Sequence, residues 1–200
     1  HGLLVFPAQE LGGADLTNFM SKFTTLRPRH GVEITLEGFP HVVIVSNIEE
    51  NDEAIGHQPD QGIEWHSDGT GWQQDTLATC LYGVEIPKQG GDTLFANGYL
   101  SLNALPPALS KQVKRLSITY SRLYLYERLG YAKKLSTEEL AQFSDVTKPL
   151  VVTHPVTQRE ALVFSIEECK CIDGMNESQS YEFLSQLLEF ITAENQIYRH

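Results

Sequence analysis

Short apolar runs separated by turn residues are the feature that most constrains the fold of this chain. Most of the runs contain β-branched or aromatic side chains, and Gly, Pro, Asn or Asp residues bound them, which is typical of β-strands. The predicted strands are residues 3–6, 42–45, 63–68, 76–84, 92–96, 117–120, 150–153 and 161–165. Short strands punctuated in this way favour a double-stranded β-helix, or jelly roll.

Helices are predicted at the flanks of these strands. Apolar residues recur with helical spacing over residues 14–23 and 178–192, and Ser136 with Glu139 forms a capping box that begins another helix. Further short helices are predicted at 99–105 and 107–116, a long loop at 48–62 and a mobile excursion at 124–134. The predicted fold class is therefore mainly β with flanking helices (α+β), in a cupin-like jelly roll.

Charge and composition narrow the class of partner. Two hundred residues suit one domain, and 41% hydrophobic with 20% charged residues can bury a core. The net charge of −11 argues against a nucleic-acid or anionic-membrane binder, and no apolar run approaches a membrane span. We therefore expect a small-molecule partner and leave a homo-oligomer open. Three cysteines, Cys80, Cys169 and Cys171, are expected to be reduced thiols of a cytoplasmic protein.

One pair of polar residues points to metal chemistry. His66 and Asp68 are two positions apart, so on an extended segment both side chains project from the same side. Mononuclear non-haem iron sites use two His and one carboxylate on one face of the metal. The pair His66 and Asp68 could supply two of these three ligands. By itself a His-x-Asp pair is a weak signal.

The surrounding segments make the pair specific. In chain order they are Trp65-His66-Ser67-Asp68, then Gly90-Gly91-Asp92-Thr93, then the segment 149–159 and finally Ile197-Tyr198-Arg199-His200. Together they resemble the TauD/TfdA (taurine dioxygenase) family of Fe(II)- and 2-oxoglutarate-dependent dioxygenases. The resemblance covers nearly the whole of residues 1–200, which we expect to be a single domain lacking its N-terminal start and its C-terminal end.

The resemblance implies a reaction and roles for particular residues. The protein would hydroxylate, or otherwise oxidise, a small organic substrate with O2 and 2-oxoglutarate, releasing succinate and CO2. His66 and Asp68 would be the first two Fe(II) ligands, and Thr93 would donate its hydroxyl to a 2-oxoglutarate carboxylate. The distal His ligand and the Arg that binds 2-oxoglutarate are expected beyond residue 200.

Other polar and aromatic residues have weaker assignments. Arg29, His30 and Trp72 are candidate substrate contacts, against the alternatives of ordinary surface charge for the first two and a loop anchor for Trp72. His154 and His200 match family positions that are not iron ligands. Arg159 and Arg199 are expected to be framework residues.

Two other functions stay open at this point. The first is a jelly-roll domain that binds a metabolite and has lost catalysis. The second is a hydrolytic zinc site, because zinc enzymes also use two His and a carboxylate. The Gly-Gly-Asp-Thr segment has no explanation in a zinc hydrolase, which therefore ranks last.

Overall fold

The computed structural model describes residues 2–28, 34–56 and 64–200, and the chain divides into two compact units. Unit 1 comprises His1–Ile63, Leu77–Val84 and Leu129–Gln142, and unit 2 comprises Glu64–Thr76, Glu85–Arg128 and Phe143–His200. Both units are assembled from three separate stretches of sequence. Among the described residues, no helix is both long and apolar enough to span a membrane.

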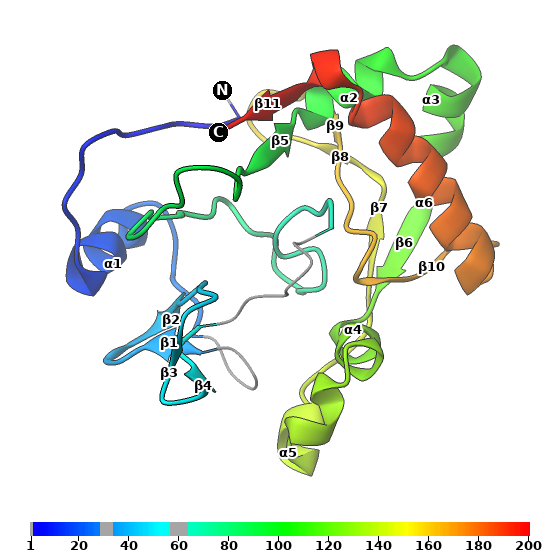
Figure 1. The fold of residues 1–200 in the computed structure, drawn as a ribbon. Helices are drawn as coiled ribbons and strands as arrows, with labels where there is room; N and C mark the ends of the chain where they lie inside the picture. The colour runs from blue at the N-terminus through cyan, green and yellow to red at the C-terminus, as the bar shows by residue number, and fades with distance from the viewer. Residues whose placement is uncertain (1, 29–33, 57–63) are drawn as a thin grey trace. The chain divides into compact units, whose positions relative to one another are not determined.

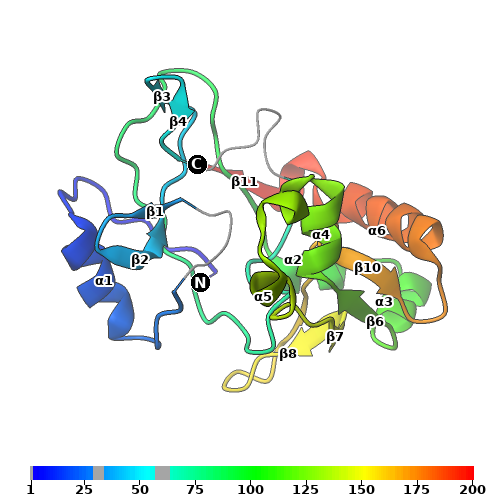
Figure 2. The ribbon, with the colours of Figure 1, turned by 90° about the horizontal axis from the view of Figure 1, so that it is seen from below.

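Unit 1 is built around one helix and short strand pairs. The helix α1 (Gly13–Ser21) packs against β2 (Phe39–Val43), which pairs antiparallel with β1 (Thr35–Leu36), as Figure 2 shows. The predicted helix at 14–23 is therefore confirmed, and the predicted strand at 42–45 lies earlier. Further elements are β3 (Glu49–Glu50), β4 (Glu53–Ala54), the 3-10 helix η1 (Tyr131–Lys134) and α5 (Thr137–Leu140).

The predicted capping box of α5 is present. The Ser136 hydroxyl accepts a hydrogen bond from the Glu139 amide at 3.2 Å, and the Glu139 carboxylate accepts one from the Ser136 amide at 2.8 Å. Two amides at the start of the helix are thereby satisfied by side chains. By contrast, the predicted loop 48–62 contains the β3–β4 hairpin, and its residues 57–63 lie outside the described part of the chain.

Unit 2 contains the main hydrophobic core. An antiparallel sheet has the order β10 (Cys169–Ile172), β6 (Ser117–Tyr120), β7 (Val146–Pro149), and α6 (Glu177–Ile191) packs on it beside β10 (Figure 1). The residues buried between sheet and helices include Val113, Ile118, Leu150, Ile172, Leu184 and Leu187. Burying an aliphatic side chain of this size contributes roughly 2 kcal/mol.

Shorter elements of unit 2 surround that core. A hairpin joins β8 (Val151–Thr153) to β9 (Glu160–Leu162), as predicted, and β5 (Leu94–Ala96) pairs antiparallel with β11 (Ile197–Arg199). The helices are α2 (Gly98–Ala104), α3 (Pro107–Val113), α4 (Arg122–Arg128) and the 3-10 helix η2 (Glu194–Gln196). The described chain is thus a mixture of helices and antiparallel strands, and all three cysteines are free thiols.

Besides the strand predicted at 63–68, which is not formed over its described residues, three predicted elements are wrong. Residues 3–6 and 76–84 join no strand of the described chain, and apolar side chains there are exposed: Leu4 is 69%, Leu77 68% and Val84 87% exposed. Apolar, β-branched composition favours a strand only where a partner strand and a surface to bury are at hand. The predicted excursion at 124–134 instead contains most of α4, whose Tyr126 is buried, and η1.

Candidate active site

The predicted iron-binding pair lies together in unit 2. The His66 Nε2 atom is 3.0 Å from the Asp68 Oδ1 atom, and both side chains are exposed to solvent. On its other side, the His66 ring donates a hydrogen bond from Nδ1 to the Glu64 carbonyl oxygen at 2.7 Å. The carbonyl fixes the ring orientation and directs Nε2 toward the carboxylate.

The Asp68 carboxylate also controls the protonation of His66. Its hydrogen bond to the ring is the main cause that raises the His66 pKa from 6.5 to about 9, and burial opposes this rise. The Glu64 carbonyl and the charge of Glu167 add to the increase. At neutral pH the ring in the metal-free protein is therefore an imidazolium that donates from both nitrogens.

The separation of the two atoms suits a metal ion. Two ligands on adjacent corners of an octahedron, with metal–ligand bonds of about 2.1 Å, lie about 3.0 Å apart. The Nε2–Oδ1 distance of 3.0 Å matches that spacing. The residues therefore fit two ligands of a hard divalent ion. Within the described part of the chain, no cluster of three or more His, Cys, Asp or Glu side chains could hold a metal.

The segment that carries the pair belongs to no strand: the chain bends at Trp65, and a turn begins at Asp68. Burial alternates along it: Trp65 and Ser67 are half-buried, and His66 and Asp68 are exposed. The His66 and Asp68 side chains lie close together, as the sequence predicts, whereas the strand predicted at 63–68 is not formed over its described residues. A backbone hydrogen bond from the Ser67 amide to the Phe164 carbonyl, at 3.0 Å, attaches the segment to the core.

Thr93 is held by a different part of unit 2. It directly precedes β5, and its backbone exchanges two hydrogen bonds with His200, at 3.1 and 2.9 Å. This pairing extends the β5–β11 ladder by one residue and fixes the backbone from which the Thr93 hydroxyl projects. The His200 ring contacts the Tyr198 hydroxyl through Nδ1 at 3.1 Å.

Trp72 lies on the loop after Asp68 and stacks on a cation. The Arg122 guanidinium carbon is 4.6 Å from the centre of the Trp72 ring. This contact gives the loop-anchor role a physical basis. Arg122 also forms an ion pair with buried Glu168, at 3.4 Å. Sequence reasoning missed both Arg122 and Glu168, because they come from distant segments and match no local motif.

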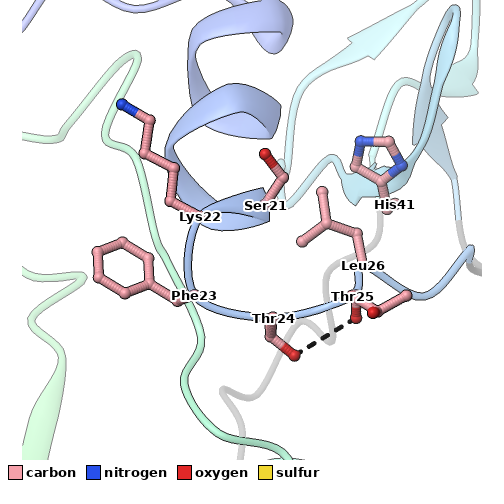
Figure 3. Close-up of a pocket in the computed structure, with 7 residues that line it drawn as sticks. All are labelled: Ser21, Lys22, Phe23, Thr24, Thr25, Leu26 and His41. Atoms are coloured by element: carbon pink, nitrogen blue, oxygen red, sulfur yellow. Dashed lines mark hydrogen bonds between the residues drawn. The ribbon is translucent and has the colours of Figure 1, made fainter.

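The other two candidate substrate contacts, Arg29 and His30, lie outside the described residues. Just before them in the sequence, a pocket of about 640 Å³ in unit 1 is formed by the chain after α1 and by His41 of β2. Figure 3 shows Lys22 and Phe23 on one side of this pocket and His41 on the other. The His41 Nε2 atom is 2.9 Å from the Thr17 hydroxyl.

The remaining His and Arg candidates have framework contacts. The His154 Nδ1 atom accepts hydrogen bonds from the amides of Val156 and Thr157 within its own turn, both at 3.2 Å. Arg199 pairs with Asp92 at 2.7 Å. These contacts agree with the framework roles expected from the sequence. Arg159 also has a local partner, since its guanidinium carbon is 4.0 Å from the Tyr99 ring centre.

Comparison with known proteins assigns the family. The family model described as taurine catabolism dioxygenase TauD, TfdA family matches residues 1–200. The (S)-phenoxypropionate/alpha-ketoglutarate-dioxygenase of Delftia acidovorans is 25% identical over 214 aligned positions, covering 100% of this chain and 70% of that protein. Alpha-ketoglutarate is another name for 2-oxoglutarate.

Solved structures agree with this assignment. The crystal structure of AAD-2 in complex with Mn(II) and N-oxalylglycine has a TM-score of 0.50 and 28% identity, over 58% of this chain and 45% of that chain. A taurine dioxygenase from Burkholderia xenovorans, at 24% identity, shows likeness of fold alone: its TM-score is 0.62 over 96% of this chain. This chain covers 59% of the Burkholderia structure, less than two thirds of its length. The resemblance predicted from the sequence is confirmed, and the chain belongs to the TauD/TfdA family.

Proposed function

We propose that the protein is an Fe(II)- and 2-oxoglutarate-dependent dioxygenase that oxidises a small organic substrate and releases succinate and CO2. The observation that carries this proposal is the His66–Asp68 pair, whose nitrogen and oxygen lie 3.0 Å apart in a chain of the TauD/TfdA family.

Each residue of the site has a defined task in this proposal. His66 and Asp68 hold the iron, and the Glu64 carbonyl keeps the imidazole oriented by accepting from Nδ1. Iron held by His66 and Asp68 would supply the oxidation of the substrate by O2, coupled to the conversion of 2-oxoglutarate to succinate and CO2. The Thr93 hydroxyl donates a hydrogen bond to a carboxylate of 2-oxoglutarate, on a backbone fixed by β11.

The rest of the iron site and of the fold completes the proposal. A third iron ligand and an Arg that pairs with 2-oxoglutarate would complete the site, and the fold of the proposed enzyme is a jelly roll. The relatives' names include (S)-phenoxypropionate, 2,4-dichlorophenoxyacetate and sulfonate as substrates. Aryloxyalkanoic acids and sulfonates are therefore the first substrates to screen.

Succinate release by the full-length protein tests this function. With Fe(II), 2-oxoglutarate and O2, the wild type is expected to form succinate faster when its primary substrate is present. His66→Ala and Asp68→Ala each remove a ligand and are expected to lower the rate by at least about 100-fold. Succinate is measured by mass spectrometry.

The matched control is His154→Ala, which removes a histidine that only supports a turn. This variant is expected to retain most of the wild-type rate. Wild-type rates in both ligand variants would refute the proposal. Substrate binding without succinate release would favour the metabolite-binding domain, and Zn(II)-dependent hydrolysis of a substrate without succinate release would favour a hydrolase.

A further inference from the structure

The loop that follows Asp68 is held by two buried side chains from distant segments. The Thr70 hydroxyl donates a hydrogen bond to Glu168 Oε2 at 2.6 Å, and the Gly71 amide donates one to the same oxygen at 2.9 Å. Trp72, the next residue, stacks on Arg122. Each of these three consecutive loop residues therefore contacts Glu168 or Arg122.

Glu168 and Arg122 also bind each other away from water. Their side chains are 12% and 11% exposed, and Arg122 Nη1 lies 3.4 Å from Glu168 Oε1. Arg122 Nη2 donates to the Tyr126 hydroxyl at 2.5 Å. A buried charge is costly unless it is paired and hydrogen-bonded. Glu168 meets that condition, and Arg122 is paired through both of its Nη atoms, so the pair supports the loop from the core.

Asp68 lies between two places where its segment is hydrogen-bonded to the core. On its N-terminal side, the Ser67 amide is bonded to Phe164, and on its C-terminal side Thr70 and Gly71 are bonded to Glu168. The two attachments flanking Asp68 are both made to residues 164–168 of the core. The Gly71 backbone also packs closely against Glu168, since a Cβ added at Gly71 would lie 3.1 Å from Glu168 Oε2.

We propose that Glu168, paired with Arg122, is a positioning residue that sets the Asp68 carboxylate for metal binding by fixing residues Thr70 to Trp72. The proposal rests on the proposed function, because it assigns Asp68 to the metal. A displacement of a ligand by about 1 Å is enough to weaken a site of this kind substantially. Glu168 acts through the loop and does not touch the metal.

Metal affinity of the full-length protein tests this role. Glu168→Gln keeps the shape of the side chain but removes its charge toward Arg122. We expect Mn(II) affinity, measured by electron paramagnetic resonance in the presence of 2-oxoglutarate, to fall about tenfold, as for outer-shell partners of metal ligands. In the metal-free protein, hydrogen exchange of the Gly71 amide is expected to become about tenfold faster.

Thr70 provides a second, gentler test. Thr70→Val removes the hydroxyl at nearly constant shape and is expected to weaken Mn(II) binding about fivefold, whereas Thr70→Ser keeps the donor and stays within about twofold of the wild type. The matched control is Asp75→Asn. The Asp75 side chain is 83% exposed, and the substitution removes its ion pair with Lys148. This variant is expected to bind Mn(II) like the wild type.

The outcomes separate this inference from the proposed function. If the wild type binds no Mn(II) and forms no succinate, the proposed function fails. If the wild type binds Mn(II) and the folded Glu168→Gln and Thr70→Val variants bind it equally well, only the positioning role is refuted. Loss of the native circular dichroism spectrum in both variants would also refute it, because the pair would then be needed to fold the core.

Discussion

At the scale of single residues, His66 and Asp68 share a proton-mediated contact in the metal-free protein. The proton on Nε2 lies between the two atoms that would bind the metal, so protons and metal compete for one place. The same two atoms therefore bind either a proton or, in the proposed enzyme, a metal ion. A neighbouring carboxylate, Glu167, favours the protonated ring through its charge.

The titration of His66 follows from this contact. In the metal-free protein its pKa is expected near 9, and Asp68→Asn should lower it toward 6.5, because the charged acceptor is the main cause of the shift. Nuclear magnetic resonance of the ring nitrogens measures both values. A His66 pKa that stays near 9 in Asp68→Asn would assign the shift to another cause.

The sign of the effect on stability is fixed by the direction of the shift. Because the folded-state pKa lies above the unperturbed value, the contact stabilises the metal-free protein fully below pH 6.5 and loses this contribution as the pH rises through about 9. Asp68→Asn should therefore flatten the dependence of stability on pH in that window.

At the scale of elements, α6 shows how a local signal can fix a helix. The Asn176 side chain accepts a hydrogen bond from the Gln179 amide at 2.9 Å, and the Gln179 side chain accepts one from the Asn176 amide at 3.0 Å. The helix then presents Leu184, Leu187 and Ile191 to the core. The apolar face was predicted from the sequence, whereas the cap was found in the structure.

Removal of this cap should destabilise the protein by a modest amount. Asn176→Ala is expected to lower the free energy of unfolding by about 1 kcal/mol, whereas Asn176→Asp should retain most of it, because a carboxylate also caps the amide. Urea unfolding gives both values. Equal losses in the two variants would show that the cap is not the cause.

Strands were much harder to predict than helices because their stability depends on distant partners. The helices at 14–23 and 178–192 follow from periodicity within one window, and each was found. The strands β10 and β11 pair with β6 and β5, which lie far away in sequence, and both were missed. Residues 76–84 have strand composition without a partner among the described strands.

At the scale of the whole molecule, both tryptophans, Trp65 and Trp72, lie in unit 2, so their fluorescence reports on its unfolding. Leu184 is fully buried in the core of that unit. Leu184→Ala is expected to cost about 2–5 kcal/mol in the free energy of unfolding. The control Leu100→Ala, at a position 54% exposed, should change it by less than about 0.5 kcal/mol.

The candidate site shows the same limit on prediction at this scale. Spacing alone placed His66 and Asp68 side by side, because residues two apart on an extended chain project together. No spacing could indicate Glu168, which is 98 residues from Thr70 and becomes its partner only through the tertiary fold. The motif therefore indicated the candidate ligands but not the side chains that hold the loop beside them.

The division of sequence between the two units also limits how this protein can be altered. Each unit is made of three stretches that alternate along the chain with stretches of the other. A gene fragment that encodes only one of these stretches therefore does not encode a complete unit. Exchange of a unit with a relative by recombination would need several crossovers at once. A single crossover with a relative's gene would instead join parts of each unit's core that come from two different proteins.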